Sequence, residues 1–146
     1  MSALLNIQDY FIDELVVRTN PDFKRDGEGK GDIGVSFDLR RKGQEPKFII
    51  NMTVEANKSK KSFSSAPYYV SVKLGGLFIF PEGTDDDTMM KMLGTNGLAI
   101  LYGVARGVVG QSTASCRYGK FVLPSVNFME LIKKQVKKTK KNAATV

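Results

Sequence analysis

Three short stretches of this sequence carry residue types that do chemistry in other proteins. The first, "GKGDIG" at residues 29–34, has the GxGxxG spacing of dinucleotide sites. That motif needs a helix after the glycines, with its N-terminus facing the pyrophosphate, whereas these glycines lead into the alternating stretch "IGVSFDL", which is typical of a strand. The phosphate-loop pattern GxxxxGKS or GxxxxGKT does not occur. The sequence therefore predicts no nucleotide site.

The other two stretches are an acidic cluster and a thiol. Neighbouring carboxylates such as Asp85, Asp86 and Asp87 attract hard cations, but consecutive side chains point in different directions. Acids just before a helical pattern are typical of a helix N-terminus. Cys116 lies beside Arg117, which favours a thiolate, yet no histidine is present to act as a base. We interpret the acids as a cap and Cys116 as a partly buried structural residue.

The lack of histidine and the single cysteine exclude whole classes of function. They rule out Cys/His zinc sites, Ser-His and Cys-His nucleophiles, and a disulfide within the chain. We therefore expect no enzyme, no catalytic residue, no metal and no cofactor. The start "MSALLNIQDYF" lacks the basic and apolar regions of a signal peptide, and no run of 18 apolar residues is evident, so we expect a cytoplasmic protein without membrane insertion.

The net charge of +7 on 146 residues is concentrated at one end. The last 14 residues contain six lysines and no acid, and the rest of the chain is close to neutral. We predict one domain over residues 1–132, long enough for a single core, and a basic, frayed or disordered tail over 133–146. The alternative is a nucleic-acid-binding protein that acts through this tail.

Period-two alternation predicts four strands, and helical periodicity follows them. In strand one, "NIQDYFIDELVV", the pattern places Ile7, Phe11, Leu15 and Val17 on one face with Asp9 and Asp13, and Tyr10, Ile12 and Val16 on the other. Strands two and three, "DIGVSFDLR" and "KFIINMTVEA", form a hairpin through "RKGQEP" and turn inward the residues Ile33, Val35, Phe37, Leu39, Phe48, Ile50, Met52 and Val54. Strand four runs from about Ala66 to Leu74, with Tyr68, Val70, Val72 and Leu74 on one face.

The helical half begins after "FPEGTDDD" with "TMMKML", which "GTNG" is expected to interrupt. The next helix, "LAILYGVARGVVGQS", has an apolar stripe of Ile100, Leu101, Val104 and Val108 beside the small residues Ala99, Gly103, Gly107 and Gly110. Glycine costs about 1 kcal/mol relative to alanine inside a helix, so this row indicates a close crossing with another element. Asn127 and Glu130 form a capping-box-like start for a last helix.

Two glycines lie within the apolar stretch "VSVKLGGLFIF", residues 70–80. They are compatible with a strand defect, a phosphate loop or part of a binding surface. The six methionines adapt to irregular apolar partners. Together with the apolar residues on both predicted faces, they fit a protein that buries one surface in an oligomer and offers another to apolar peptide.

Several pieces, taken in order, resemble the SecB family of protein-export chaperones over essentially the whole chain. The pieces are "PDFKRDG" at 21–27, "GGLF" at 75–78, "AILYGVAR" at 99–106 and "LPSVNF" at 123–128. The resemblance implies an α+β fold with a four-stranded antiparallel sheet, helices on one face, and a dimer of dimers. It further implies peptide-binding residues Phe23, Phe78, Phe80 and Phe128, and interface residues Val70, Val72, Leu74, Ala99, Gly103 and Gly107.

The function implied by this resemblance is an ATP-independent holdase that binds unfolded preproteins in export; the alternative is a SecB-like chaperone dedicated to an antitoxin or another single client. This sequence differs from the family pattern at three positions. Gly27 stands where the family has tryptophan, and Gly103 and Ser125 stand where it has proline. The family contacts the motor SecA through acids on strands one and four. Those positions carry Glu14, Arg18 and Ser71 here, so only Glu14 retains the acid.

Overall fold

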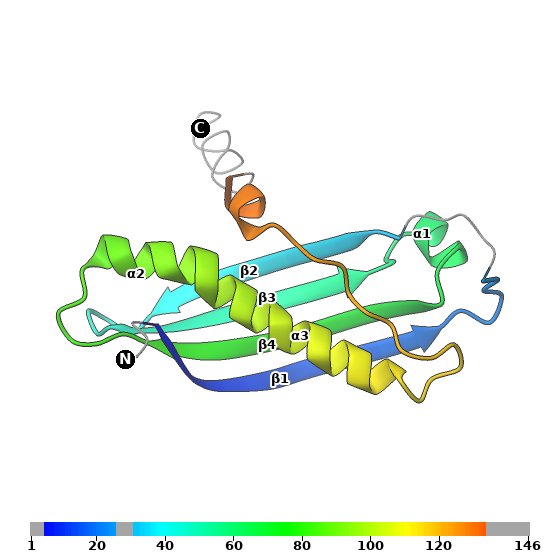
Figure 1. Ribbon diagram of the computed structural model, residues 1–146, viewed down its shortest axis with the longest axis horizontal. Coiled ribbons are helices and arrows are strands. Elements are labelled where there is room, and N and C mark those ends of the chain that lie inside the picture. Colours follow the sequence, from blue (N-terminus) through cyan, green and yellow to red (C-terminus); the bar gives the residue numbers. More distant parts are fainter. Residues whose placement is uncertain (1–4, 26–30, 134–146) are drawn as a thin grey trace.

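The computed structural model describes residues 5–25 and 31–133, which build a four-stranded antiparallel sheet with a long helix across one face (Figure 1). Of the predicted tail, only Lys133 lies within the described residues. The order across the sheet is β1 (Asn6–Thr19), β4 (Tyr68–Ile79), β3 (Lys47–Ala56) and β2 (Ile33–Arg41). The predicted α+β class, with helices on one face and a hairpin between β2 and β3, is confirmed.

The helical half is more continuous than expected. Helix α2 (Asp86–Met92) passes through the π-helical segment η1 (Leu93–Gly97) into α3 (Leu98–Thr113), so "GTNG" does not interrupt it. A Cβ at Gly97 would lie 3.4 Å from Cδ1 of Ile50 and 3.7 Å from Cε1 of Phe78, so this glycine packs directly on the sheet. A short helix that the pattern missed, α1 (Lys60–Ser64), connects β3 to β4.

The predicted caps are present. Both carboxylate oxygens of Asp85 accept hydrogen bonds from Thr88, from its amide at 3.0 Å and its hydroxyl at 2.7 Å. These bonds lower the pKa of Asp85. Asp85 is thus the helix cap, whereas Asp86 pairs with Arg41 at 3.0 Å. Asn127 Oδ1 accepts from the Glu130 amide at 3.3 Å, where the last helix begins.

The side of the sheet that faces α3, called here the helix side, holds the core. As predicted, it receives alternate residues of β2, β3 and β4, because these strands pair without a register shift. The other side, called here the open face, carries mainly polar residues such as Asp38, Asn51, Thr53 and Lys73. The expectation of apolar residues on both faces was therefore wrong for most of the sheet.

The predicted faces of β1 were also wrong, because two irregularities interrupt its alternation. Its pairing with β4 shifts between Ile7 and Asp9 and again between Ile12 and Glu14. Each bulge moves the following side chains to the opposite face. Phe11 consequently lies opposite Gly75 on the open face, whereas Ile7, Leu15 and Val17 share the helix side with Tyr10 and Ile12.

Gly75 and Gly76 make room on opposite faces of β4. A Cβ at Gly75 would lie 2.4 Å from Cζ of Phe11, and one at Gly76 would lie 3.2 Å from Cδ1 of Leu101 in α3. Strand β4 keeps an unbroken register with β3 through both positions, so the glycines are not a strand defect. They allow an aromatic ring to lie over one face and the long helix to approach the other.

The continuous helix Asp86–Thr113 is long and apolar enough to cross a membrane by length and composition, which the sequence pattern had not indicated. Core helices pass the same test. In this structure the helix packs on the sheet and buries Leu98, Leu101, Tyr102, Ala105 and Val109. The predicted stripe was therefore rotated, because Ile100 is exposed and Val104 and Val108 are only half-buried.

Candidate peptide-binding surface

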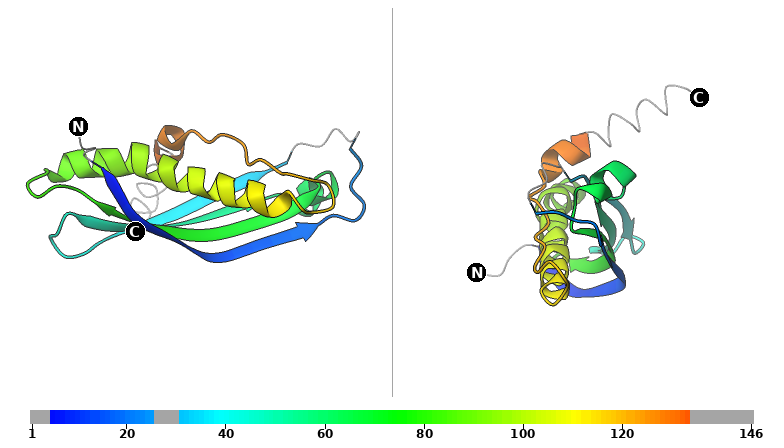
Figure 2. Two further views of the ribbon diagram at one scale, coloured as in Figure 1. Left: turned by 60° about the horizontal axis from the view of Figure 1, so that its bottom comes forward. Right: turned by 90° about the vertical axis from the view of Figure 1, so that its right-hand side faces the viewer.

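An irregular segment, residues 114–127, runs back across the helix side of the sheet and is called the strap here. It is orange in Figure 1, and Figure 2 shows from two other directions that it lies on the same side of the sheet as α3. At its start, Tyr68 Oη donates to the carbonyl of Gly119 at 2.9 Å and accepts from the amide of Tyr118 at 2.8 Å. The strap has no strand ladder, so side chains satisfy several of its backbone groups.

Helix α3 holds the second half of the strap. Thr113 Oγ1 accepts from the amide of Phe121 at 2.8 Å, and Arg106 Nε donates to the carbonyl of Leu123 at 3.0 Å. Tyr102 Oη donates to the carbonyl of Pro124. Burial raises the pKa of Tyr102, which keeps its hydroxyl protonated and able to donate. Because Leu123 is itself fully buried, the strap is fixed at both its backbone and its side chains.

Aromatic rings tie the loop after β1 to the strap. The ring of Phe23 packs edge-on against Tyr118, with centroids 5.0 Å apart, and Tyr68 lies between Tyr118 and Phe121 at 6.1 and 6.3 Å. Tyr118 Oη donates to the carbonyl of Asn20 at 2.8 Å. Three distant segments of the chain therefore meet at this end of the sheet.

A partly apolar hollow of about 340 Å³ opens beside this cluster and is called the strap hollow. Its walls come from the strap, the start of β2, the end of β3 and the segment after α1. Its polar lining consists of Asp32, Asn57 and Ser65, and its apolar lining includes Ile33, Ala66, Pro67, Phe121, Val122 and Pro124. The side chain of Val122 is 53% exposed. The hollow therefore offers apolar surface to a side chain from outside.

The helix side of β2 extends this apolar surface. Ile33 lines the strap hollow and begins a row of half-buried side chains that continues through Val35, Phe37 and Leu39. In the part of the chain that the structure describes, β2 pairs only with β3, so its outer edge has free amide and carbonyl groups. Such an edge can bind an extended peptide as an additional strand.

The predicted peptide-binding residues do not form one exposed groove. Phe78 and Phe80 are buried in the core at 0% and 2% exposure, and Phe80 packs on Phe48. Phe128 is buried against Tyr102, and only Phe23 is half-buried, against Tyr118. Their role in client binding stays a prediction. The sequence pattern missed Val122 and Phe121, which lie in the irregular strap.

The predicted interface residues fall into two groups. Val70, Val72 and Leu74 are buried on the helix side within the single chain. Ala99, Gly103 and Gly107 lie on the exposed side of α3, and a Cβ at either glycine would meet nothing within 4 Å. Only the second group is accessible to another chain. Association stays a prediction.

The positions aligned with the SecA contact lie on the open face. Glu14 is opposite Lys73, while Arg18 stacks on the ring of Tyr69 with its guanidinium carbon 5.2 Å from the centroid. Ser71 is buried between neighbours. Of the three aligned positions, only Glu14 presents an acid, and a further carboxylate, that of Glu55, lies beside Ser71 and Tyr69.

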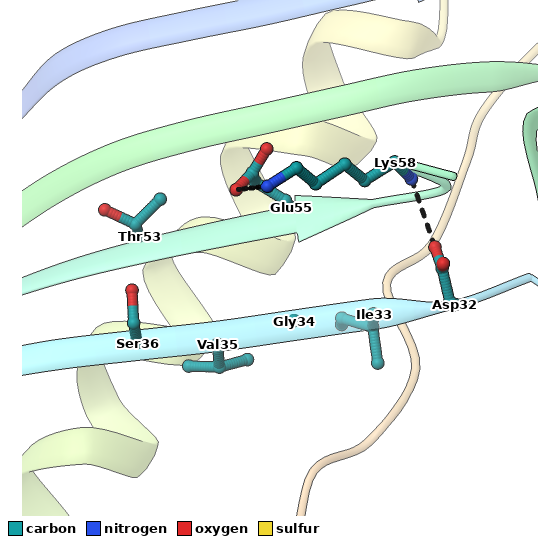
Figure 3. A pocket seen from close by; sticks show the side chains of 8 residues that line it. All are labelled: Asp32, Ile33, Gly34, Val35, Ser36, Thr53, Glu55 and Lys58. Atoms are coloured by element: carbon teal, nitrogen blue, oxygen red, sulfur yellow. Dashed lines mark hydrogen bonds and ion pairs between the residues drawn. The ribbon is translucent and has the colours of Figure 1, made fainter. Parts of the chain in front are cut away.

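Polar residues surround a second hollow, of about 330 Å³, at the β2–β3 end of the open face (Figure 3). There Lys58 Nζ lies 3.8 Å from Glu55 Oε1, and the Lys58 amide donates to Asp32 Oδ1 at 3.1 Å. Desolvation alone would raise the pKa of Asp32, but hydrogen bonds from Ser62 and the Lys58 amide outweigh it and lower that pKa. Both carboxylates are thus occupied by structural contacts.

Comparisons with known proteins agree with this architecture. The family model "Preprotein translocase subunit SecB" matches residues 2–139. The protein-export protein SecB of Alcanivorax borkumensis is 26% identical over 122 residues, which cover 84% of this chain and 77% of that protein. An uncharacterised protein of Methanocaldococcus jannaschii is 26% identical over 124 residues, with coverage of 84% and 79%. A SecB-like chaperone of Mycobacterium tuberculosis, solved in complex with a peptide from the HigA1 antitoxin, superposes with a TM-score of 0.63 at 12% identity, over 84% of this chain and 91% of that one.

Proposed function

This chain belongs to the SecB family, and from that premise we propose that it is an ATP-independent holdase for non-native polypeptide. The strap hollow would take an apolar client side chain, and the row on β2 would take those that follow. The free edge of β2 would pair with the client backbone. A folded protein presents no such segment, so selectivity would come from slow folding.

The proposal rests on the position of Ile33. This residue lines the strap hollow, begins the apolar row on β2, and belongs to the strand whose outer edge is free. One extended segment can contact all three at once, because alternate side chains of a strand point to the same face. The long apolar row favours a range of clients over a single sequence. The predicted clients are unfolded preproteins or an antitoxin, met in the cytoplasm. The mycobacterial SecB-like chaperone, which was solved with an antitoxin peptide bound, supports the second kind of client.

Replacing Val122 by aspartate is expected to raise the protein concentration that gives half-maximal protection by about tenfold, because a carboxylate in the strap hollow opposes apolar burial. Since Val122 is 53% exposed, the free energy of unfolding should change by less than about 0.5 kcal/mol. The measurement is light scattering by a chemically denatured, slowly folding client without nucleotide.

The matched control is Met90→Asp, because Met90 in α2 is 50% exposed and lies outside the strap hollow. It should protect like the wild type. If both variants lose protection equally, the effect is one of general charge and the strap hollow is not the client site. If the wild-type protein does not protect, the holdase proposal fails.

We also propose that the exposed side of α3 mediates assembly into a tetramer. Gly103 and Gly107 leave a flat strip that a second helix can approach closely. Replacing Gly103 by leucine should strengthen the isolated helix by up to about 1 kcal/mol, yet it should shift the assembly to smaller species by obstructing that approach. Sedimentation velocity measures the size of the assembly. Gly103→Ala, which adds a much smaller side chain, should shift it less. An unchanged tetramer in the leucine variant would place the interface elsewhere.

A further inference from the structure

A third hollow, of about 340 Å³, lies where α1 meets the open face, and it is called the basic hollow here. Its lining consists of Arg18, Asn57, Lys58, Lys60, Phe63 and Tyr69. Three cations and two aromatic rings therefore surround it, and no carboxylate lines it. The proposed client surface lies on the helix side of the sheet, and the basic hollow shares only the wall residue Asn57 with the strap hollow, so the two hollows are separate.

Two of these cations are available to a ligand. Neither Arg18 nor Lys60 forms an ion pair with another of the described residues. The guanidinium carbon of Arg18 lies over the ring of Tyr69, 5.2 Å from its centroid, and a guanidinium in a cation–π contact can still donate its N–H groups to a carboxylate. The cationic group is thus positioned before anything binds.

The nearest acid is already occupied. Glu55 accepts from Tyr69 Oη at 2.9 Å through one carboxylate oxygen, and the other lies 3.8 Å from Lys58 Nζ, the pair drawn in Figure 3. Burial and the hydrogen bond to Glu55 raise the pKa of Tyr69, so the phenol stays a neutral donor. Glu55 therefore fixes Tyr69 and Lys58 and does not neutralise Arg18 or Lys60.

We infer that the basic hollow docks an acidic peptide segment of a partner protein. One carboxylate of that segment binds the N–H groups of Arg18, a neighbouring carboxylate binds Lys60, and an apolar or aromatic side chain packs on Phe63. Client and acidic partner then occupy opposite faces of the sheet and do not compete.

The charges around the basic hollow favour an acidic peptide over two other possible occupants, the lysine-rich end of this chain and a nucleic-acid strand. The lysine-rich end of this chain has no acid, so it does not complement the site. A nucleic-acid strand needs a continuous series of cations for its phosphates. Along β1 the open face continues from Arg18 to Glu14 and Asp9, whose carboxylates repel a phosphate chain. A short acidic segment fits within the hollow and avoids them.

The test is fluorescence anisotropy with a labelled peptide of repeated Asp-Asp-Phe units, added to the wild-type protein and to the double variant Arg18→Glu/Lys60→Glu. The variant should bind at least about tenfold more weakly, since two charge-assisted contacts become repulsive. The matched control is Arg117→Glu/Lys91→Glu, which makes the same charge change at exposed positions outside the basic hollow and should shift affinity less than about twofold.

Several outcomes would overturn the inference. Equal losses of affinity in the two double variants would indicate long-range electrostatic attraction without a specific site. If an Asn-Asn-Phe peptide bound as tightly as the Asp-Asp-Phe peptide, recognition of charge would be excluded. Tighter binding of a labelled oligouridine, lost in the same variant, would assign the hollow to nucleic acid. A change in sedimentation would make it an interface between copies. Protection of a denatured client should be unchanged in the variant, so this result is separable from the holdase proposal.

Discussion

Replacing Phe78 by aspartate is expected to unfold this chain, and not only to remove a peptide contact. The side chain of Phe78 is 0% exposed and lies under the long helix beside Gly76 and Gly97. Loss of the ring costs about 3–5 kcal/mol and a buried, unpaired carboxylate adds more, which together approach the whole stability of a typical domain. Circular dichroism and urea unfolding at equal protein concentration measure the effect.

The control for Phe78 is leucine, which keeps an apolar side chain at the position. Phe78→Leu should cost about 1–2 kcal/mol and leave protection of a denatured client unchanged. A stably folded Phe78→Asp protein that lacks only client binding would contradict the burial described here. It would show that Phe78 is exposed in the working form of the protein, as the family resemblance implies.

Much of the fold follows from local pattern. Strands β2, β3 and β4 pair without register shifts, so period-two alternation assigned Val35, Met52 and Val72 to the correct face. Capping also depends on neighbours only a few residues away, which is why Asp85 and Asn127 were identified from sequence. Local signals were not sufficient everywhere, because α1, which begins after the cap Ser59, was missed.

The remainder depends on contacts between distant segments. The bulges in β1 follow from its pairing with β4, and a sequence pattern cannot locate an extra residue in a strand. The strap has no periodicity, because Tyr68, Arg106 and Tyr102 hold it through side-chain hydrogen bonds to its backbone. The candidate site was therefore only partly predictable: Ile33 was identified as inward-facing, but Val122 beside it was not.

Replacing Leu123 by alanine is expected to lower the free energy of unfolding by about 2–5 kcal/mol, because this fully buried side chain leaves a cavity under the strap. The same change should weaken client protection, since the flanking residues Val122 and Pro124 line the strap hollow. Denaturant unfolding measures the loss of stability, and light scattering by a denatured client measures the loss of protection. Hydrogen exchange reports loosening of the strap itself, as faster exchange of the Phe121 amide that Thr113 holds.

The neighbouring substitution Val122→Ala separates stability from binding. Because that side chain is 53% exposed, its loss should cost less than about 1 kcal/mol and leave exchange of the Phe121 amide unchanged, while protection still falls. If Leu123→Ala lowers the free energy of unfolding no more than Val122→Ala does, the strap is not packed as described. If Leu123→Ala loosens the strap and protection persists, client binding depends on the row along β2 and not on the strap hollow.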